Sequence, residues 1–209
     1  MNITFTGERF FLSTIKFDFG IPYDTVVQEL KNENWQSWTY NTPMGHENPN
    51  WNTRHRITQV QSPILKKIVD FVQSDAVRDQ MLDNLYSFNP AFQGLWSLSK
   101  DQMRNWANWH MEFMMDQPGF YLEPHNDYRR LICAGMLYFN ESNDPAVATT
   151  FYTDRQLNGE LVLPNGYGTG WIAVNDYCNW HTGKNASDYD RYSALLGFTI
   201  KTPEEYDRK

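Results

Sequence analysis

The 209-residue sequence predicts a mainly β domain with flanking helices, built as a β-sandwich or jelly-roll barrel. After Leu95 the chain runs through short apolar segments separated by Gly, Asn and Pro, which is typical of closely spaced strands. Before them stands one strongly amphipathic segment, with no alternation of strands and helices that would indicate βαβ units. We expect a single domain, 1–209, in which a helical or irregular support region (1–94) precedes the β core (95–209).

The support region carries one clear helical signal. Residues 1–63 are polar, rich in Asn and aromatic side chains, and show few clear periods, so we expect them to be irregular. From 64 to 88 apolar residues recur at three- and four-residue intervals, which predicts one amphipathic helix packed on the outside of a sheet. Asn89-Pro90 ends the pattern.

The strand signals follow in quick order. Apolar and polar residues alternate over 109–115, which indicates a half-buried strand, whereas the near-continuous apolar run 131–139 suits a strand covered on both faces. Pro118-Gly119 and Asn158-Gly159 have the composition of turns. The predicted strands are 109–115, 120–124, 131–139, 171–174 and 192–200.

Bulk composition excludes several classes of protein. The net charge of −7 leaves no basic stripe to offset phosphates, so the chain is not a general nucleic-acid binder. The longest apolar run, 131–139, is far shorter than the roughly 20 residues that span a bilayer, and the first residues lack a signal-peptide pattern. Two cysteines, Cys133 and Cys178, build no disulfide framework, so a reducing cytoplasm fits best. The oligomeric state stays open.

Three residues, His125, Asp127 and His181, are candidate metal ligands. Residues two apart on an extended strand share a face, so His125 and Asp127 can converge on one ion, with His181 joining from a distant strand. Two imidazoles and one carboxylate form a facial triad that holds non-haem Fe(II) and leaves positions open. Alone, the pair His125-Asn-Asp127 is more often chance and His181 a surface residue. Arg191 and Ser193, which offer donors suited to a carboxylate, favour the metal site.

Three segments resemble one family. The sequence PGFYLEPHND (118–127) resembles the first iron-binding segment of prolyl-hydroxylase-like Fe(II)/2-oxoglutarate oxygenases. MLYFN (136–140) resembles the strand that follows it, and RYSALLGF (191–198) resembles the last core strand, which starts with the co-substrate arginine. The similarity covers about 112–201 and does not extend to the first half. It implies a cupin-like double-stranded β-helix with a metal at one mouth.

The resemblance also implies roles for residues. His125, Asp127 and His181 become the Fe(II) ligands, while Arg191 and Ser193 become partners of the distal carboxylate of 2-oxoglutarate.

Tyr138 takes the position where related hydroxylases place a phenol against that carboxylate; a core aromatic is the equal alternative. Met115 stands where some relatives have a further tyrosine, so that contact is absent or replaced. Whether Arg130 or Tyr121 touches the co-substrate stays open.

The implied activity is that of a dioxygenase that uses Fe(II), 2-oxoglutarate and O2. We expect hydroxylation of a C–H bond in a peptide or a small polar metabolite, with release of succinate and CO2. The main alternative is a non-catalytic cupin-like metal- or ligand-binding module, which needs no Arg191. A zinc-dependent hydrolase is disfavoured because no Glu stands at a motif spacing to act as the base, although Glu123 is close to His125. Five tryptophans form either a lid or packing on the barrel: Trp35, Trp38, Trp51, Trp106 and Trp180.

Overall fold

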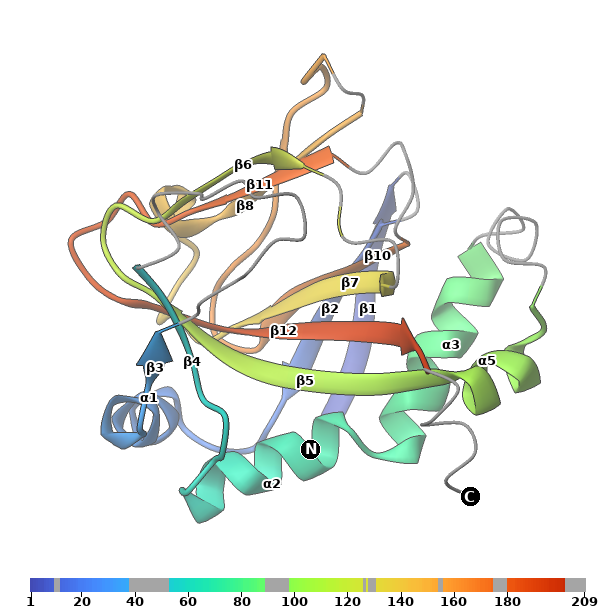
Figure 1. Ribbon diagram of the computed structural model, residues 1–209, viewed down its shortest axis with the longest axis horizontal. Helices are drawn as coiled ribbons and strands as arrows, with labels where there is room; N and C mark the ends of the chain where they lie inside the picture. The colour runs from blue at the N-terminus through green and yellow to red at the C-terminus, as the bar shows by residue number, and fades with distance from the viewer. Residues whose placement is uncertain are drawn as a thin grey trace.

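The structure, a computed structural model, consists of two antiparallel sheets with helices on one side (Figure 1). It describes residues 1–9, 12–37, 53–88, 98–125, 127, 131–153, 156–174 and 180–201. The eight-stranded sheet has the order β1 (Asn2–Arg9), β2 (Leu12–Asp18), β10 (Thr169–Val174), β7 (Leu131–Tyr138), β12 (Arg191–Ile200), β5 (Ala107–Asp116), β4 (Arg54–Arg56) and β3 (Gln36–Ser37). The four-stranded sheet has the order β6 (Tyr121–His125), β11 (Trp180–Lys184), β8 (Thr149–Tyr152) and β9 (Leu161–Val162).

The two sheets bury one apolar cluster between them. Met136 and Trp171 of the large sheet meet Phe151 of the small sheet in this cluster. From β5 onward the chain passes back and forth between the two sheets in the manner of a double-stranded β-helix, with the hairpin β8–β9 within the small sheet, so the predicted fold class is confirmed.

The helices cover the opposite face of the large sheet (Figure 1). Their apolar sides form a second, larger cluster with that face, in which Leu30, Leu65 and Met81 are fully buried. The helices are α1 (Tyr23–Asn32), α2 (Pro63–Val72), α3 (Asp75–Phe88) and α5 (Lys100–Trp106), with a short 3₁₀ turn η2 (Pro145–Val147) in the barrel. None of the helices among the described residues is long and apolar enough to cross a membrane.

The single helix predicted over 64–88 is two helices. The chain breaks at Gln73 and Ser74, where the Ser74 hydroxyl accepts a hydrogen bond from the Val77 amide and so begins α3. Asp75 in the first turn of α3 adds a favourable charge at the helix N-terminus. The apolar period runs on through the break because both helices bury the same side against the sheet. Their predicted place outside the sheet is confirmed.

The expectation of an irregular N-terminal region is wrong for the residues that the structure describes. Strands β1 and β2 form an antiparallel pair that extends the large sheet by joining β10. In β2 the buried Ile15 and Phe17 alternate with exposed Lys16 and Asp18. This period of two was present in the sequence, but the Asn- and Trp-rich residues that follow obscured it.

Strand β5 is more deeply buried than its sequence predicts. The expected alternation holds only at Met111 to Phe113, where Glu112 is half-buried between two buried residues, whereas Met114, Met115 and Asp116 are all buried. Met114 lies in the cluster between the sheets, whereas Met115 lies in the cluster under the helices. The strand therefore ends inside the barrel, where even its polar residue has no access to water.

Candidate active site

Two paired strands bring the predicted metal ligands together. His125 ends β6 and His181 lies in β11, and the two are direct cross-strand partners with ring centroids 4.4 Å apart. Asp127 follows two residues after His125. Its carboxylate oxygens lie 3.8 Å from His125 Nε2 and 3.6 Å from His181 Nε2. The sequence expectation that these three residues, the triad, meet at one point agrees with this geometry.

The triad has the dimensions of a metal site. All three potential ligand atoms lie within 4.8 Å of one another. Two ligands about 2.1 Å from a shared ion are separated by about 3.0–3.7 Å, close to the two His–Asp spacings of 3.8 and 3.6 Å. His125 Nδ1 donates a hydrogen bond to the Glu123 carbonyl oxygen at 2.7 Å, which leaves Nε2 free to face the carboxylate. Such an outer hydrogen bond is the usual way to orient a metal-binding imidazole.

The surroundings of the triad keep the His125 imidazole unprotonated, as cation binding requires. Burial and the neighbouring His181 ring lower the pKa of His125 to about 4, against the opposing effect of the Asp127 charge. His125 is therefore neutral near pH 7, with an available lone pair on Nε2. A divalent ion would meet no competing proton there.

An aromatic wall of Tyr138, Phe151 and Trp171 lies beside the triad inside the barrel. The Phe151 ring stacks on His181 at 5.0 Å, and Trp171 meets the same imidazole edge-on at 5.6 Å. Trp171 Nε1 donates to the Tyr138 hydroxyl at 3.0 Å, and that hydroxyl shares a 2.5 Å hydrogen bond with Thr149. Burial raises the pKa of Tyr138, so its phenol stays protonated. The Tyr138 phenol is therefore fully buried and already hydrogen-bonded within the protein.

The alternation of β12 turns the predicted carboxylate partners inward. Arg191 and Ser193 are 1% and 0% exposed, while Tyr192 between them points to the opposite face of the sheet. Ser193 Oγ has no hydrogen-bond partner among the described residues. A buried hydroxyl without a partner is costly, and a bound carboxylate would satisfy it.

Arg191 is already bound to a carboxylate of the protein. Its Nε donates to Asp116 at 2.9 Å, its Nη2 contacts the same carboxylate, and its Nη1 donates to the Val147 carbonyl oxygen at 3.0 Å. Sequence reasoning missed this contact. The hint in the sequence is Asp116 itself, an acid directly after the apolar residues Phe113, Met114 and Met115.

A second arginine shares the same carboxylate. Arg54 donates to Asp116 through Nε at 2.6 Å and Nη2 at 3.0 Å, and its guanidinium lies 4.1 Å above the Phe120 ring. Burial alone would raise the pKa of Asp116, but Arg191 and Arg54 together outweigh it and hold that pKa below its ordinary value. The charge cluster of Arg54, Asp116 and Arg191 therefore carries one net positive charge.

Comparison with known proteins gives structural neighbours only. No family model matches the chain, and no curated protein of similar sequence was found. A 2OG-Fe(II) oxygenase family oxidoreductase from Burkholderia pseudomallei matches with a TM-score of 0.53 and 10% identity, over 88% of this chain and 80% of that one. A Pseudomonas putida prolyl-4-hydroxylase matches with a TM-score of 0.54 and 14% identity, over 92% and 94%. A Trichoplax adhaerens prolyl hydroxylase, solved with a peptide fragment of hypoxia inducible factor, matches with a TM-score of 0.56 and 12% identity, over 88% and 80%.

The chain has the fold of the 2OG-Fe(II) oxygenases. Identities of 10–14% carry the fold and not the chemistry, so the roles of individual residues rest on the geometry above. In this oxygenase fold the triad occupies paired strands of the small sheet, and the charge cluster lies across the large sheet.

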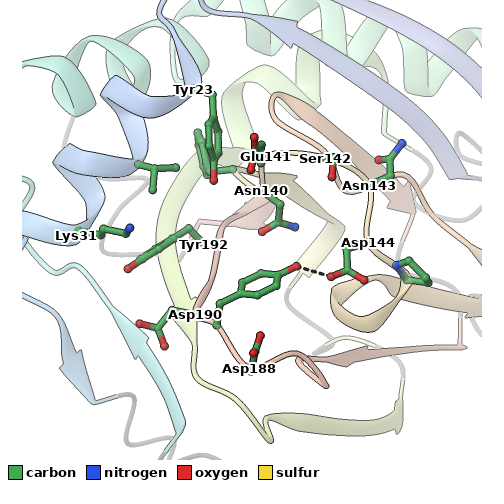
Figure 2. A pocket seen from close by; sticks show the side chains of 14 residues that line it. Tyr23, Lys31, Asn140, Glu141, Ser142, Asn143, Asp144, Asp188, Asp190 and Tyr192 are labelled. Carbon is green, nitrogen blue, oxygen red and sulfur yellow. Dashed lines mark hydrogen bonds between the residues drawn. The ribbon is translucent and has the colours of Figure 1, made fainter.

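A separate cavity of about 720 Å³ lies on the outer side of β12 (Figure 2). Tyr192 and Asp190 point into it from the β12 end, and the Tyr189 hydroxyl hydrogen-bonds Asp144 across it. Its lining includes none of the triad and neither Arg191 nor Ser193. The cavity is therefore distinct from the candidate active site of the oxygenase fold.

The remaining candidates divide by position. Trp35 packs on Tyr192 at 5.8 Å on the outer side of the large sheet, and Trp106, the last residue of α5, is 47% exposed. Trp180 immediately precedes His181 on β11. Tyr121 is 41% exposed on β6. Trp38, Trp51, Arg130 and Cys178 lie outside the described residues, and so does the predicted helix end at Asn89-Pro90.

Proposed function

We propose that this protein is an Fe(II)- and 2-oxoglutarate-dependent dioxygenase. The observation that carries the proposal is the cross-strand pair His125 and His181, with the Asp127 carboxylate within 4 Å of both Nε2 atoms, in an oxygenase fold. Two imidazoles and one carboxylate are the donor set that suits non-haem iron and leaves positions for co-substrate and O2.

Each group would contribute one part of the activity. The triad would hold the metal, while Arg191 and Ser193 would bind the distal carboxylate of 2-oxoglutarate; Tyr138 is the direct cross-strand partner of Ser193. Phe151 and Trp171 exclude water beside His181. Fe(II) with 2-oxoglutarate and O2 would supply the oxidising chemistry for a C–H hydroxylation, with succinate and CO2 as co-products. A reducing cytoplasm suits such a site because it preserves Fe(II).

For the substrate we propose a peptide or a small polar metabolite. The Trichoplax neighbour was solved with a peptide, which supports a peptide as the first class to test. The side chains of His125 and Asp127 are themselves 30% and 21% exposed, which would give a substrate access to a metal held there.

The decisive experiment is an anaerobic Fe(II) titration with and without 2-oxoglutarate. A weak visible charge-transfer band should appear only with both, and aerobic protein should then release succinate slowly without a substrate. His181→Ala should lose the metal and the band. His110→Ala is the matched control, because His110 lies on β5 away from the triad. Succinate release that persists in His181→Ala would mean that the triad is not the metal site.

A non-catalytic metal-binding module is the second candidate. The observation that favours it is the existing bond between Arg191 and Asp116, which occupies part of the expected co-substrate anchor. Wild-type protein that binds Fe(II) at the triad but shows no affinity for 2-oxoglutarate would establish this alternative.

A further inference from the structure

The charge cluster spans three neighbouring strands of the large sheet. Asp116 on β5 is the direct cross-strand partner of Arg54 on β4 and of Arg191 on β12. Direct partners point to the same face, so the carboxylate lies between the two guanidiniums. All three side chains are buried, with side-chain exposures of 9%, 0% and 1% for Arg54, Asp116 and Arg191.

We propose that Asp116 and Arg54 set the charge of the co-substrate anchor, so that Arg191 presents one net positive charge to a single carboxylate. The inference rests on the proposed function and extends it to two positioning residues. The carboxylate of Asp116 cancels one of the two guanidinium charges. Because Arg54 on β4 supplies a second guanidinium, one positive charge remains beside Arg191 on β12. Arg54 thus acts on the ligand through Asp116.

The donors left on Arg191 fit this role. A guanidinium has five N–H groups, and the bonds to Asp116 and Val147 use three of them. The remaining two, together with the hydroxyl of Ser193 on the same face of β12, can serve one carboxylate. Asp116 fixes the plane of the Arg191 guanidinium through Nε and Nη2, so those donors are held in place before the ligand arrives.

The charge balance decides how variants should behave. In a buried site charges are weakly screened, so a change of one unit strongly affects anion affinity. Without Arg54 the cluster is neutral and should bind a carboxylate poorly. Without the Asp116 charge it has two positive charges, which destabilises the ligand-free protein but favours an anion. Removing both restores one positive charge on Arg191.

The test measures the dissociation constant of 2-oxoglutarate with full-length protein and Fe(II) under anaerobic conditions, through the charge-transfer band. Arg54→Met should weaken binding by about tenfold or more, as expected for losing one nearby charge. Asp116→Asn should bind at least as tightly as wild type, with a lower ligand-free Tm that 2-oxoglutarate raises by more than in wild type. The double variant should bind within about threefold of wild type, since its net charge is unchanged.

Two controls separate charge from structure. Arg56→Met removes an arginine two residues along β4 that pairs with Glu112 and is 42% exposed, and it should leave affinity unchanged. The keto acid 2-oxobutyrate lacks a distal carboxylate, so its affinity should be the same in wild type and Arg54→Met. If Arg54→Met fails to fold, Arg54→Lys keeps the charge without the bidentate geometry and should bind 2-oxoglutarate near the wild-type level.

Three results would overturn the inference. They are wild-type affinity in Arg54→Met, a double variant as weak as Arg54→Met, or an equal loss for 2-oxobutyrate and 2-oxoglutarate. Any of these leaves the proposed function standing as long as wild type binds 2-oxoglutarate. Wild-type protein that binds Fe(II) without affinity for 2-oxoglutarate overturns both.

Discussion

The hydroxyl of Tyr138 offers a quantitative test of the barrel interior. It accepts a hydrogen bond from Trp171 Nε1 at 3.0 Å and shares a 2.5 Å bond with the Thr149 hydroxyl, and the residue is fully buried. Tyr138→Phe keeps the ring in place and removes only this oxygen. The change therefore isolates the polar link that joins β7, β8 and β10 beside the triad.

The expected cost follows from the partners left behind. A buried donor such as Trp171 N–H costs about 1–3 kcal/mol when its acceptor is removed. The Thr149 hydroxyl can rotate toward another acceptor, so its loss adds about 0.5–1 kcal/mol. The two contributions sum to about 1.5–4 kcal/mol, which lowers the Tm of a domain of this size by about 3–16 °C.

Thermal and urea unfolding of wild type, Tyr138→Phe and Tyr167→Phe measure this cost. In the control, the Tyr167 hydroxyl donates to the Ile21 carbonyl oxygen in a half-buried contact where water can replace it, so its loss should cost less than about 1 kcal/mol. Fe(II) affinity should stay at the wild-type level in both variants. Equal Tm values for Tyr138→Phe and wild type would refute the buried network as a source of stability.

Three further predictions concern the anchor and the sheet. Arg191→Met should keep Fe(II) affinity and lose about 10–1000-fold in 2-oxoglutarate affinity in the charge-transfer titration, with Arg191→Lys between; an unchanged value would end its role as anchor. Gly135→Ala should lower the Tm in a thermal scan, because the new Cβ would meet the Trp171 carbonyl oxygen at 2.4 Å; a wild-type Tm would show that β7 and β10 can separate at no cost. Because the folded-state pKa of Asp116 lies below its ordinary value of 3.8, its charge stabilises the fold above that pH, and the stabilisation fades as the pH falls further. Stability measured from pH 5 to pH 2 should thus drop more steeply in wild type than in Asp116→Asn, and parallel curves would contradict this.

Local patterns explain what the sequence could predict. The apolar run in β7 and the residues around His125 predict local strands correctly, because strand period and turn residues depend on only a few neighbouring positions. The triad could be predicted for a related reason, since His125 and Asp127 form a motif and only His181 had to come from elsewhere. The sequence signal for the break between α2 and α3 is Ser74-Asp75, a typical helix start, but the apolar period that continues across it favoured a single helix.

Long-range register explains what the sequence could not predict. Asp116 meets partners 62 residues before it and 75 residues after it, and no local pattern specifies either distance. A one-residue shift of β4 against β5 would turn Arg54 away from the carboxylate altogether. The contact therefore depends on the folded sheet, and the resemblance over 112–201 does not reach Arg54.

Strand β4 has a consequence for how this protein can be divided. Cutting the chain at residue 95 separates the support region from strands β5 to β12, but it also removes Arg54 and uncovers the edge of β5. The remaining barrel would hold Asp116 against Arg191 alone, a cancelled pair with no charge left over for a ligand. Any transplant of this barrel to another scaffold, and any lineage that exchanges its N-terminal half, must supply a cation at that edge.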